Sequence, residues 1–488
     1  MNHISFGTSG HRGIIGKSFT RNHLIAIAKA IGAYFKSNSI LSPKVLIGYD
    51  TRTGNSPTLE DNSYTFALIQ TLKDQKIRID FCDNYAPTPI ISWSVKTYDY
   101  DMGIILTASH NPPNYNGIKI NDKNGAPASI KLTNWIQAEA NKFFTSDDAF
   151  KPQKKTPNIN QVNYTKPFIS HLTTLLKNEF QLPFPDFANE YVIDPKCGSA
   201  IEVWKVLTAD SIGVIHWIND NYNSDFNFKL PNPTSQETIN ELGEICKAKN
   251  CIGLSNDPDA DRHALIDEEG DFVSPEKIAA IIINYLYISE IAIESVSTTL
   301  ANSTLVKNIC SKYKIQLHET NIGFKYFTPY LLNAFNKRRL AIGVESSGGF
   351  SISLHSFDKC GFLPLLIIMG IMKKRSKSLA DLTNEINDIH NTFYFEEDAA
   401  EVNYDFSNVI TKRLKSNQSI LSDLFDLKIK EINTDDGLKI IFDNFDWVLC
   451  RPSGTEPLVR IYAESTNGDQ SKLYVNTIKQ LLLTSKSE

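Results

Sequence analysis

The sequence predicts an α/β protein with three βα-rich, mixed-sheet domains of similar type and a smaller α+β domain at the C-terminus. Short apolar runs alternate with 3.6-residue helical patterns over most of the 488 residues, which is typical of βα units. The alternation changes near Phe393, where a different mixture of segments begins. At roughly 150 residues per domain, the length allows three or four domains. We place them at 1–150, 151–265, 266–390 and 391–488.

The first domain begins with an amphipathic helix. Apolar side chains recur at helical spacing over 20–37, behind the N-cap residue Thr20. Further helices are predicted over 58–76 and 90–98, and buried strands over 45–49, 77–82 and 103–106. The polar, proline-containing stretch 145–163 interrupts this alternation and predicts a linker.

The second and third domains repeat the alternation, and the fourth departs from it. The second is expected to hold strands over 191–194, 214–218, 251–254 and 263–266 and a helix over 234–248. The third is expected to hold strands over 296–300, 315–319 and 340–344, helices over 274–289, 303–313, 323–334 and 361–373, and one or two helices within 378–392. In the fourth, helices are predicted over 406–416 and 469–484, and strands over 428–432, 438–442 and 459–463.

The composition excludes several classes of function. The 50 Lys and Arg against 55 Asp and Glu give a net charge of −5, which offers no overall field for nucleic acid or an anionic membrane. The longest apolar run, 361–372, is shorter than the ~20 residues that cross a bilayer, and the N-terminus has no signal-peptide pattern. Seven scattered cysteines match no zinc site. We expect a cytoplasmic protein with reduced thiols and with neither nucleic-acid nor membrane partners.

A serine-containing loop follows the predicted strand 103–106. Its sequence over 107–113 is Thr-Ala-Ser-His-Asn-Pro-Pro, and the carboxyl end of a strand is where open α/β sheets place their active crevices. Ser109 could carry a group covalently, with His110 and Lys119 as proton acceptors or charge stabilisers. The alternative is a solvated Asn-Pro turn.

Three aspartates alternate along the loop Asp-Pro-Asp-Ala-Asp-Arg at 257–262. Asp257, Asp259 and Asp261 would repel one another unless a hard cation held them, and an all-oxygen ligand set suits Mg²⁺. An EF-hand is excluded, because Arg262 stands where its loop needs glycine and strands replace the flanking helices. A surface acidic turn is the remaining alternative.

Three further loops combine glycine with polar groups. In Gly-Val-Glu-Ser-Ser-Gly-Gly at 343–349, Glu345 and a neighbouring serine could hold sugar hydroxyls. The segment Arg-Pro-Ser-Gly-Thr-Glu-Pro at 451–457, followed by Arg460, has the guanidinium, hydroxyls and N–H groups of a phosphate cradle. The glycine-rich loop near the N-terminus is not a P-loop, because it lacks the first glycine of that motif. Its Arg12 could bind phosphate instead. Plain glycine turns are the alternatives.

Taken together, these loops resemble those of the α-D-phosphohexomutase superfamily, which contains the phosphoglucomutases and phosphomannomutases. The motifs around Ser109 and at 257–262, 345–348 and 451–457 occur in the family's order, and the resemblance covers nearly the whole chain. Weaker agreements are Gly-Thr-Ser-Gly-His-Arg-Gly at 7–13, Gly-Tyr-Asp-Thr-Arg at 48–52 and Gly-Phe-Lys at 323–325. The resemblance implies four domains around a central cleft, to which each domain contributes one loop.

The resemblance also implies a reaction and its residues. A phosphoserine at Ser109 would give its phosphoryl group to a hexose phosphate, and the bisphosphorylated sugar would turn round and return the other one. Asp257, Asp259, Asp261 and Ser109 would hold Mg²⁺, and a sugar bisphosphate would act as activator. Glu345 and Ser347 would hold the sugar, Arg451, Ser453, Gly454 and Thr455 the phosphate that is not transferred, and Arg12, Lys119, Arg262, Lys325 and Arg460 would add positive charge. His110, Lys119 and Arg12 with a partner stay open as general bases.

The sugar loop departs from the common forms of the family, because Val344 and Ser346 flank Glu345 and no histidine closes the loop. The absent histidine disfavours dual-specificity and glucosamine-type enzymes, and it does not choose between glucose and mannose phosphates. We therefore expect a hexose-phosphate mutase for glucose or mannose phosphates, present as a monomer or homodimer. The alternatives are a phosphoglucosamine or phosphopentose mutase and a non-catalytic sugar-phosphate-binding regulator, which would not need the serine and the three aspartates.

Overall fold

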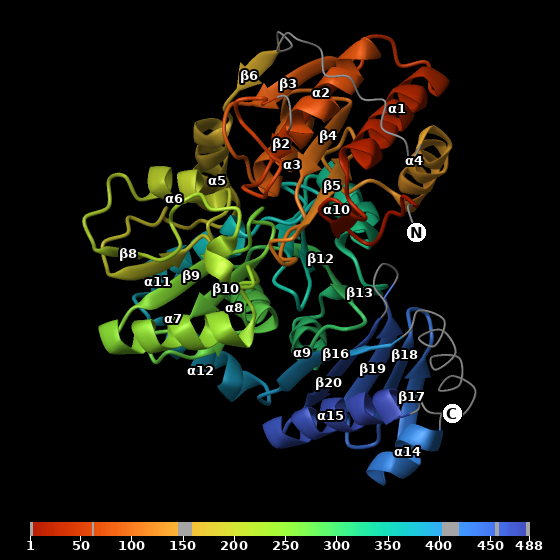
Figure 1. The fold of residues 1–488 in the computed structure, drawn as a ribbon. Coiled ribbons are helices and arrows are strands. Elements are labelled where there is room, and N and C mark those ends of the chain that lie inside the picture. The colour runs from red at the N-terminus through yellow and green to blue at the C-terminus, as the bar shows by residue number, and fades with distance from the viewer. Residues whose placement is uncertain (1–2, 61–62, 145–158, 403–418, 454–457, 485–488) are drawn as a thin grey trace.

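A computed structural model of the protein describes residues 3–60, 63–144, 159–402, 419–453 and 458–484. Within these ranges the chain forms four sheets, three mixed and one antiparallel. In Figure 1 the first domain (red to orange) lies at the top, the second (yellow to green) at the left, and the C-terminal domain (blue) at the lower right. Three similar βα domains followed by a different C-terminal one confirm the predicted fold class.

The first domain has a six-stranded sheet of order β1-β5-β4-β2-β3-β6. Its strands are β1 (His11–Ile14), β2 (Lys44–Tyr49), β3 (Arg78–Cys82), β4 (Met102–Leu106), β5 (Tyr115–Asn121) and β6 (Asn160–Val162). Its helices are α1 (Arg21–Ser37), α2 (Tyr64–Asp74), α3 (Thr88–Thr97) and α4 (Ile130–Phe143). Strands β4, β2, β3 and β6 are parallel, whereas β5 runs antiparallel to both β4 and β1.

This domain differs from the prediction in four places. Helix α2 begins at Tyr64 rather than at 58, because the Ser63 hydroxyl caps it by accepting a hydrogen bond from the Phe66 N–H at 3.1 Å. Strand β6 lies inside the predicted linker and pairs with β3, so the first sheet continues past 150. Strands β1 and β5 were not predicted, because β5 contains the turn-forming pair Asn116-Gly117 and becomes a strand only by pairing with its neighbours. Helix α4 was missed as well.

The second and third domains have sheets of order β11-β10-β9-β7-β8 and β13-β12-β14-β15. The second contains α5 (Thr165–Glu179), β7 (Tyr191–Asp194), α6 (Ala200–Leu207), β8 (Ile215–Trp217), η1 (Phe226–Phe228), α7 (Gln236–Lys249), β9 (Ile252–Asn256), β10 (His263–Ile266) and β11 (Phe272–Val273). The third contains α8 (Pro275–Ile288), β12 (Ile293–Thr299), α9 (Thr304–Lys312), β13 (Gln316–Thr320), η2 (Phe324–Tyr326), α10 (Thr328–Asn336), β14 (Leu340–Val344), β15 (Phe350–Ile352), α11 (Phe362–Arg375) and α12 (Leu379–Ile389).

Most predicted elements of these two domains are present, the single helix within 378–392 among them, and several others were not predicted. Helices α5 and α6 and strand β15 were not predicted, and β11 pairs with β10, so the second sheet continues past 265. The helix predicted over 323–334 starts as the short helix η2 before α10, and 378–392 holds a single helix, α12. The two domains share one hydrophobic core, in which Trp204 and Ile342 are fully buried together with much of α11.

The fourth domain has a fully antiparallel sheet of order β16-β20-β19-β18-β17. Its elements are β16 (Tyr394–Glu401), α14 (Ser419–Phe425), β17 (Ile429–Asn433), β18 (Leu438–Phe442), β19 (Trp447–Pro452), β20 (Leu458–Ser465) and α15 (Gly468–Thr484). β16, α14 and β19 were not predicted, and the helix predicted over 406–416 lies outside the described residues. Among the helices that are described, none is both long and apolar enough to cross a membrane.

One strand of each sheet ends in a predicted functional loop. Ser109 follows β4, Asp257 follows β9, Glu345 follows β14, and Arg451 lies at the end of β19. Because β4, β9 and β14 each have a parallel neighbour, these loops start at the sheet edge where α/β proteins place their sites.

Away from this edge, a partly buried histidine and a buried one join the first three domains. The His171 ring on α5 stacks between Trp93 of α3 and His355 of the third domain, at centroid distances of 5.2 and 5.1 Å. The two imidazoles share a hydrogen bond of 3.0 Å between Nε2 of His171 and Nδ1 of His355. Burial and then the charge of Lys96 lower the pKa of His171 to about 4, and burial lowers that of His355 as well.

This junction predicts a loss of stability in mild acid. Histidine in the unfolded chain has a pKa near 6.5, so between pH 7 and 4 these histidines bind protons in the unfolded state and stay neutral in the folded one. The free energy of unfolding therefore falls as the pH drops from 7 toward 4. We expect His171 alone to remove about 1–2 kcal/mol between pH 7 and 5. The variant His171→Gln, which cannot be protonated, should show a shallower fall of melting temperature over this interval. The surface variant His216→Gln is the control, and equal slopes for both variants and wild type would contradict the expectation.

Candidate active site

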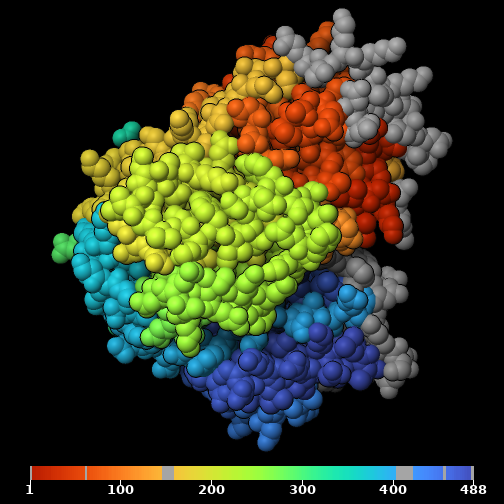
Figure 2. Space-filling view, turned by 60° about the vertical axis from the view of Figure 1, so that its left-hand side comes forward, coloured from red at the N-terminus to blue at the C-terminus, as the bar shows by residue number. Residues whose placement is uncertain are grey.

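A cleft of about 1550 Å³ lies between the four domains. Among the predicted site residues, the following line it: Arg12, His110, Arg262, Lys325, Glu345, Ser347, Arg451, Ser453 and Arg460. Figure 2 shows the C-terminal domain in blue beneath the green second domain, and these two domains border one end of the cleft with 230–239 and 393–397. Arginine and lysine from all four domains thus face one space, although the whole chain carries a net charge of −5.

Ser109 lies beneath this lining, in the turn after β4. Its backbone φ of +54° is left-handed, and the residue is fully buried. The hydroxyl donates a hydrogen bond to Oδ2 of Asp257 at 2.6 Å, and Nδ1 of His110 lies 3.4 Å from it. The Ser109 N–H donates to the Thr107 hydroxyl at 2.7 Å. The His110 ring of the first domain and the Asp257 carboxylate of the second therefore both lie beside the Ser109 hydroxyl, the candidate reactive oxygen.

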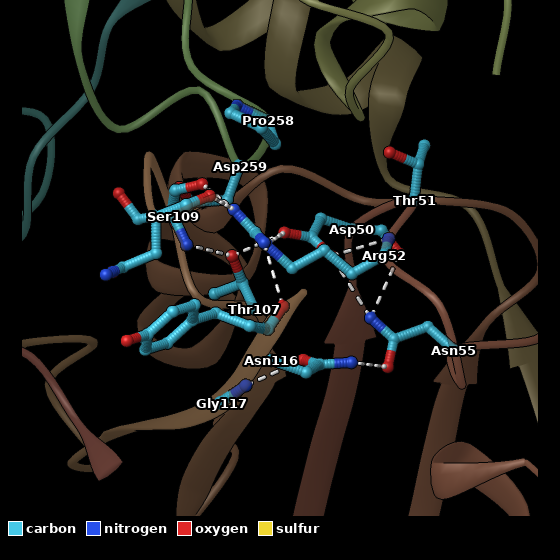
Figure 3. A network of polar contacts seen from close by, with 12 residues as sticks. Asp50, Thr51, Arg52, Asn55, Thr107, Ser109, Asn116, Gly117, Pro258 and Asp259 are labelled. Atoms are coloured by element: carbon cyan, nitrogen blue, oxygen red, sulfur yellow. Dashed lines mark hydrogen bonds and ion pairs between the residues drawn. The ribbon is translucent and has the colours of Figure 1, made fainter. Parts of the chain in front are cut away.

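Arg52 holds the serine loop in place from behind (Figure 3). It is fully buried, and its terminal nitrogens donate to four backbone carbonyls of this loop, those of Ser109, Asn111, Pro112 and Tyr115, at 2.5–2.8 Å. Its Nε lies 3.3 Å from the Asp50 carboxylate, which also accepts the Thr107 hydroxyl at 2.6 Å. Burial lowers the pKa of Arg52 to about 10 and raises that of Asp50 to about 6, and the pairing opposes both shifts.

The three aspartates form a buried acidic cluster. Asp257, Asp259 and Asp261 are fully buried, and each offers a carboxylate oxygen within 4.8 Å of the others. Lys119 contacts Asp259 and lies 2.6 Å from Oδ2 of Asp261, and Nζ of Lys359 lies 3.1 Å from the same oxygen.

This cluster fits a bound cation. Among the described residues, no hydrogen-bond donor reaches Oδ1 of Asp259 or Oδ1 of Asp261. A buried carboxylate oxygen left without a partner is costly, and an all-oxygen ligand set suits Mg²⁺. The buried triad can therefore hold a metal ion beside the Ser109 hydroxyl.

The cluster shifts neighbouring pKa values in opposite directions. Burial and then the adjacent carboxylates raise the pKa of Asp257 to about 8. Burial also acts to raise the pKa of Asp261, but Lys119 and Lys359 outweigh it and lower that pKa well below its ordinary value. Burial would lower the pKa of Lys119, yet Asp259 and Asp261 raise it above the ordinary range. These two carboxylates therefore hold Lys119 in place as a cation.

His110 stands in different surroundings. Burial and then the charges of Arg262, Arg12 and Arg460 lower its pKa well below the ordinary value, so its imidazole is neutral at pH 7. A neutral imidazole can accept a proton. Arg12 is held beside it, since Nη1 of Arg12 donates to the side-chain oxygen of Asn111 at 2.7 Å.

The glutamate loop after β14 is tied to the aspartate loop after β9. The His263 N–H donates to the Gly348 carbonyl at 3.1 Å, and Arg262 and Gly349 form a short antiparallel bridge. Gly348 has a φ of +88°, and a Cβ there would lie 2.6 Å from the His263 carbonyl oxygen, so this close approach requires glycine. Burial raises the pKa of Glu345, whose carboxylate lies 3.9 Å from Nζ of Lys359.

The predicted phosphate cradle is described in part. Arg451 donates from Nε to Oδ1 of Asp436 at 2.8 Å. The Ser453 N–H donates to the Leu458 carbonyl at 2.9 Å, and Arg460 pairs with Glu397 at 3.2 Å. Gly454 and Thr455 lie outside the described residues.

The structure thus arranges the predicted residues in two layers. Nine line the cleft, and the described lining does not include Ser109, Lys119 or the three aspartates, which lie behind it. Lys359, which reaches both Asp261 and Glu345, was missed because a single lysine ahead of an apolar helix has no distinctive sequence pattern. Arg52 and Asp50 were also missed as site residues, although the motif at 48–52 contained them.

Comparisons with known proteins agree along the whole chain. Family models for phosphoglucomutase/phosphomannomutase match four segments, as alpha/beta/alpha domain I over 3–146, domain II over 166–270, domain III over 274–389 and the C-terminal domain over 401–480. A phosphoglucosamine/phosphogalactosamine mutase of Sulfurisphaera tokodaii is 28% identical, covering 98% of both chains. A phosphoglucomutase/phosphomannomutase of Thermococcus kodakarensis is also 28% identical at the same coverage. The crystal structure of a phosphoglucomutase/phosphomannomutase family protein from Burkholderia thailandensis shares the fold, with a TM-score of 0.76 and 18% identity over 99% of this chain and 98% of that one.

Proposed function

Because the chain belongs to the phosphoglucomutase/phosphomannomutase family, we propose that it interconverts the 1-phosphates and 6-phosphates of glucose or mannose through a phosphoserine at Ser109. Family membership makes the protein an isomerase of the intramolecular phosphotransferase type. The observation that carries the serine assignment is the 2.6 Å hydrogen bond from the Ser109 hydroxyl to a buried aspartate cluster behind a cationic cleft.

The proposed reaction uses residues from all four domains. The bond between phosphorus and the Ser109 oxygen breaks while a bond forms from phosphorus to a sugar hydroxyl oxygen, and the proton of that hydroxyl passes to the neutral imidazole of His110. This leaves Ser109 as an alkoxide. In the second half the bisphosphorylated sugar presents its other phosphoryl group, the bond from that phosphorus to its sugar oxygen breaks while a bond to the Ser109 oxygen forms, and the proton on His110 returns to the sugar oxygen. Glu345 and Ser347 orient the sugar, and Arg451 and Ser453 hold the phosphate that stays.

The proposed metal ion is Mg²⁺, held by Asp257, Asp259 and Asp261 with Ser109. When bound, it would neutralise charge on the transferred phosphoryl group. The chain's own cations do the same from other sides. Lys119 is fixed against two aspartates, and Arg12 lies beside Asn111 at the cleft wall. A sugar bisphosphate is the proposed activator, because it can phosphorylate a serine that has lost its phosphoryl group.

The second candidate is an amino-sugar phosphate mutase. It is favoured by the relatives named as phosphoglucosamine mutases, among them the Sulfurisphaera protein and one from Clostridium botulinum that is 27% identical over 98% of the chain. The sugar loop here, which ends in Gly349 and lacks a histidine, disfavours this candidate and does not choose between glucose and mannose phosphates.

Side-by-side kinetics with four substrates test the proposal. We expect turnover of glucose 1-phosphate or mannose 1-phosphate, with Mg²⁺ and a catalytic amount of the bisphosphate, at a kcat/KM at least about tenfold above that for glucosamine 1-phosphate and ribose 1-phosphate. The reverse preference for the amino sugar would establish the second candidate. Absence of turnover with all four, while the sugar phosphates still bind, would contradict both and leave the non-catalytic regulator.

A further inference from the structure

Asp436 links the candidate phosphate cradle to the third domain. It lies in the turn between β17 and β18, immediately before Gly437, whose φ is +107°. A Cβ on Gly437 would lie 2.5 Å from the Cys450 carbonyl oxygen, so the turn is pressed against the end of β19. This close approach places the Asp436 side chain next to Arg451, and the mechanism above assigns it no role.

Both carboxylate oxygens of Asp436 are engaged, each with a different domain. Oδ1 accepts a hydrogen bond from Nε of Arg451 at 2.8 Å, and Oδ2 accepts one from the backbone N–H of Ile322 at 2.8 Å. Ile322 precedes the short helix η2, which carries Lys325, and both residues line the cleft. One side chain therefore fixes an arginine of the fourth domain relative to a lysine-bearing loop of the third.

The contact with Nε also orients the guanidinium. The two terminal nitrogens of Arg451 make no hydrogen bond to any residue that the structure describes, and Arg451 lines the cleft. These are the two donors that a bidentate phosphate contact uses. Burial and then the charge of Arg451 lower the pKa of Lys325, whereas Asp436 opposes this shift. The carboxylate thus reduces repulsion between two cations that come from different domains.

We propose that Asp436 is a positioning residue, which aims Arg451 and Lys325 at one and the same phosphate group of the sugar substrate. The proposal rests on the proposed function, because it takes that phosphate to be the one that is not transferred. Asp436 itself would not touch the substrate. Its two hydrogen bonds preorganise two donors, so that less ordering is left to be done when the phosphate binds.

The neighbouring residue provides a matched control. Asp435 stands in the same turn and carries the same charge, but it is exposed, and among the described residues it forms hydrogen bonds only with Asn433. We expect Asp436→Ala to raise the KM for hexose 1-phosphate roughly tenfold while kcat changes by less than about twofold. Asp435→Ala should change neither constant. Titration with glucose 6-phosphate should show the same tenfold weakening for Asp436→Ala only.

A double-mutant cycle with Arg451→Ala separates positioning from a general structural effect. In the Arg451→Ala background, Asp436→Ala should raise KM by clearly less than tenfold, because one of the two side chains that it positions is gone and only its contact with the Lys325 loop remains. An equal effect in both backgrounds, or a KM for Asp436→Ala equal to or below that of Asp435→Ala, overturns the proposal. If Asp436→Ala does not fold, Asp436→Asn carries the same comparison, since it keeps the size of the side chain and loses one acceptor.

The outcomes also distinguish this inference from the proposed function. A wild-type enzyme without hexose-phosphate mutase turnover would contradict the function, whereas the titration would still show whether Asp436 acts through Arg451. A fully active wild type with identical Asp436→Ala and Asp435→Ala variants would contradict only the role of Asp436.

Discussion

Replacing Ser109 by alanine is expected to reduce mutase turnover at least about a thousandfold, because the variant has no oxygen to carry the phosphoryl group. The fold should be preserved. The Ser109 hydroxyl makes one hydrogen bond to Asp257, and the loop is held by backbone contacts to Arg52 that the substitution leaves intact. The measurement is kcat for the 1-phosphates of glucose and mannose, with catalytic bisphosphate present.

A second readout follows the covalent intermediate directly. After incubation with the hexose bisphosphate, intact-mass spectrometry should show one added phosphoryl group on the wild type and none on Ser109→Ala. The control is Ser92→Ala, which removes a fully buried hydroxyl of the same domain that donates to the Gly125 carbonyl. It should lose about 1 kcal/mol of stability and keep its turnover. Normal turnover by Ser109→Ala would rule out the phosphoserine mechanism.

The sequence allowed the four-domain order to be predicted because its evidence is local. Apolar runs of four to six residues and helical spacing identify β2, β4, β14 and α1 without knowledge of their neighbours. Strand β1 escaped because it has only four residues, and β5 escaped because it contains Asn116-Gly117 and becomes a strand by pairing with its neighbours. Strand β6 escaped for a similar reason, because a three-residue strand in a linker-like segment pairs with β3 alone.

The sequence predicted the residues of the site's motifs, but it did not predict the residues that hold them in position. Ser109 and the three aspartates occur in segments whose residue types are unusual together, and the structure brings them into contact. Lys359 and Asp436 act through atoms that lie close only after two domains have met. No spacing along the chain encodes such a contact, so residues that position other residues are the ones that sequence patterns miss.

Among the residues that hold the candidate site in position, Arg52 is the one whose replacement should cost the most stability. Its buried guanidinium donates to four carbonyl oxygens of the serine loop and pairs with the buried Asp50 carboxylate. The variant Arg52→Leu keeps the apolar volume, removes a donor from each of those oxygens and leaves the buried Asp50 carboxylate without its positive partner. Breaking a buried pair in this way costs about 3–5 kcal/mol, which we expect to see as a lower midpoint of urea unfolding.

The mutase activity of Arg52→Leu should fall together with its stability, because the position of Ser109 changes. The Ser109 carbonyl is one of the four that Arg52 holds, at 2.6 Å, so the serine loses its fixed place opposite Asp257 even at temperatures where the variant is folded. Arg52→Lys should recover only part of both losses, because an ammonium group is a point charge and lacks the planar fork that reaches several acceptors at once. Arg339→Leu is the matched control, since it removes an arginine whose side chain is 65% exposed and pairs with Glu294 at the surface. If Arg52→Leu unfolded at the same urea concentration as Arg339→Leu and kept its kcat, the bracing role of Arg52 would be refuted.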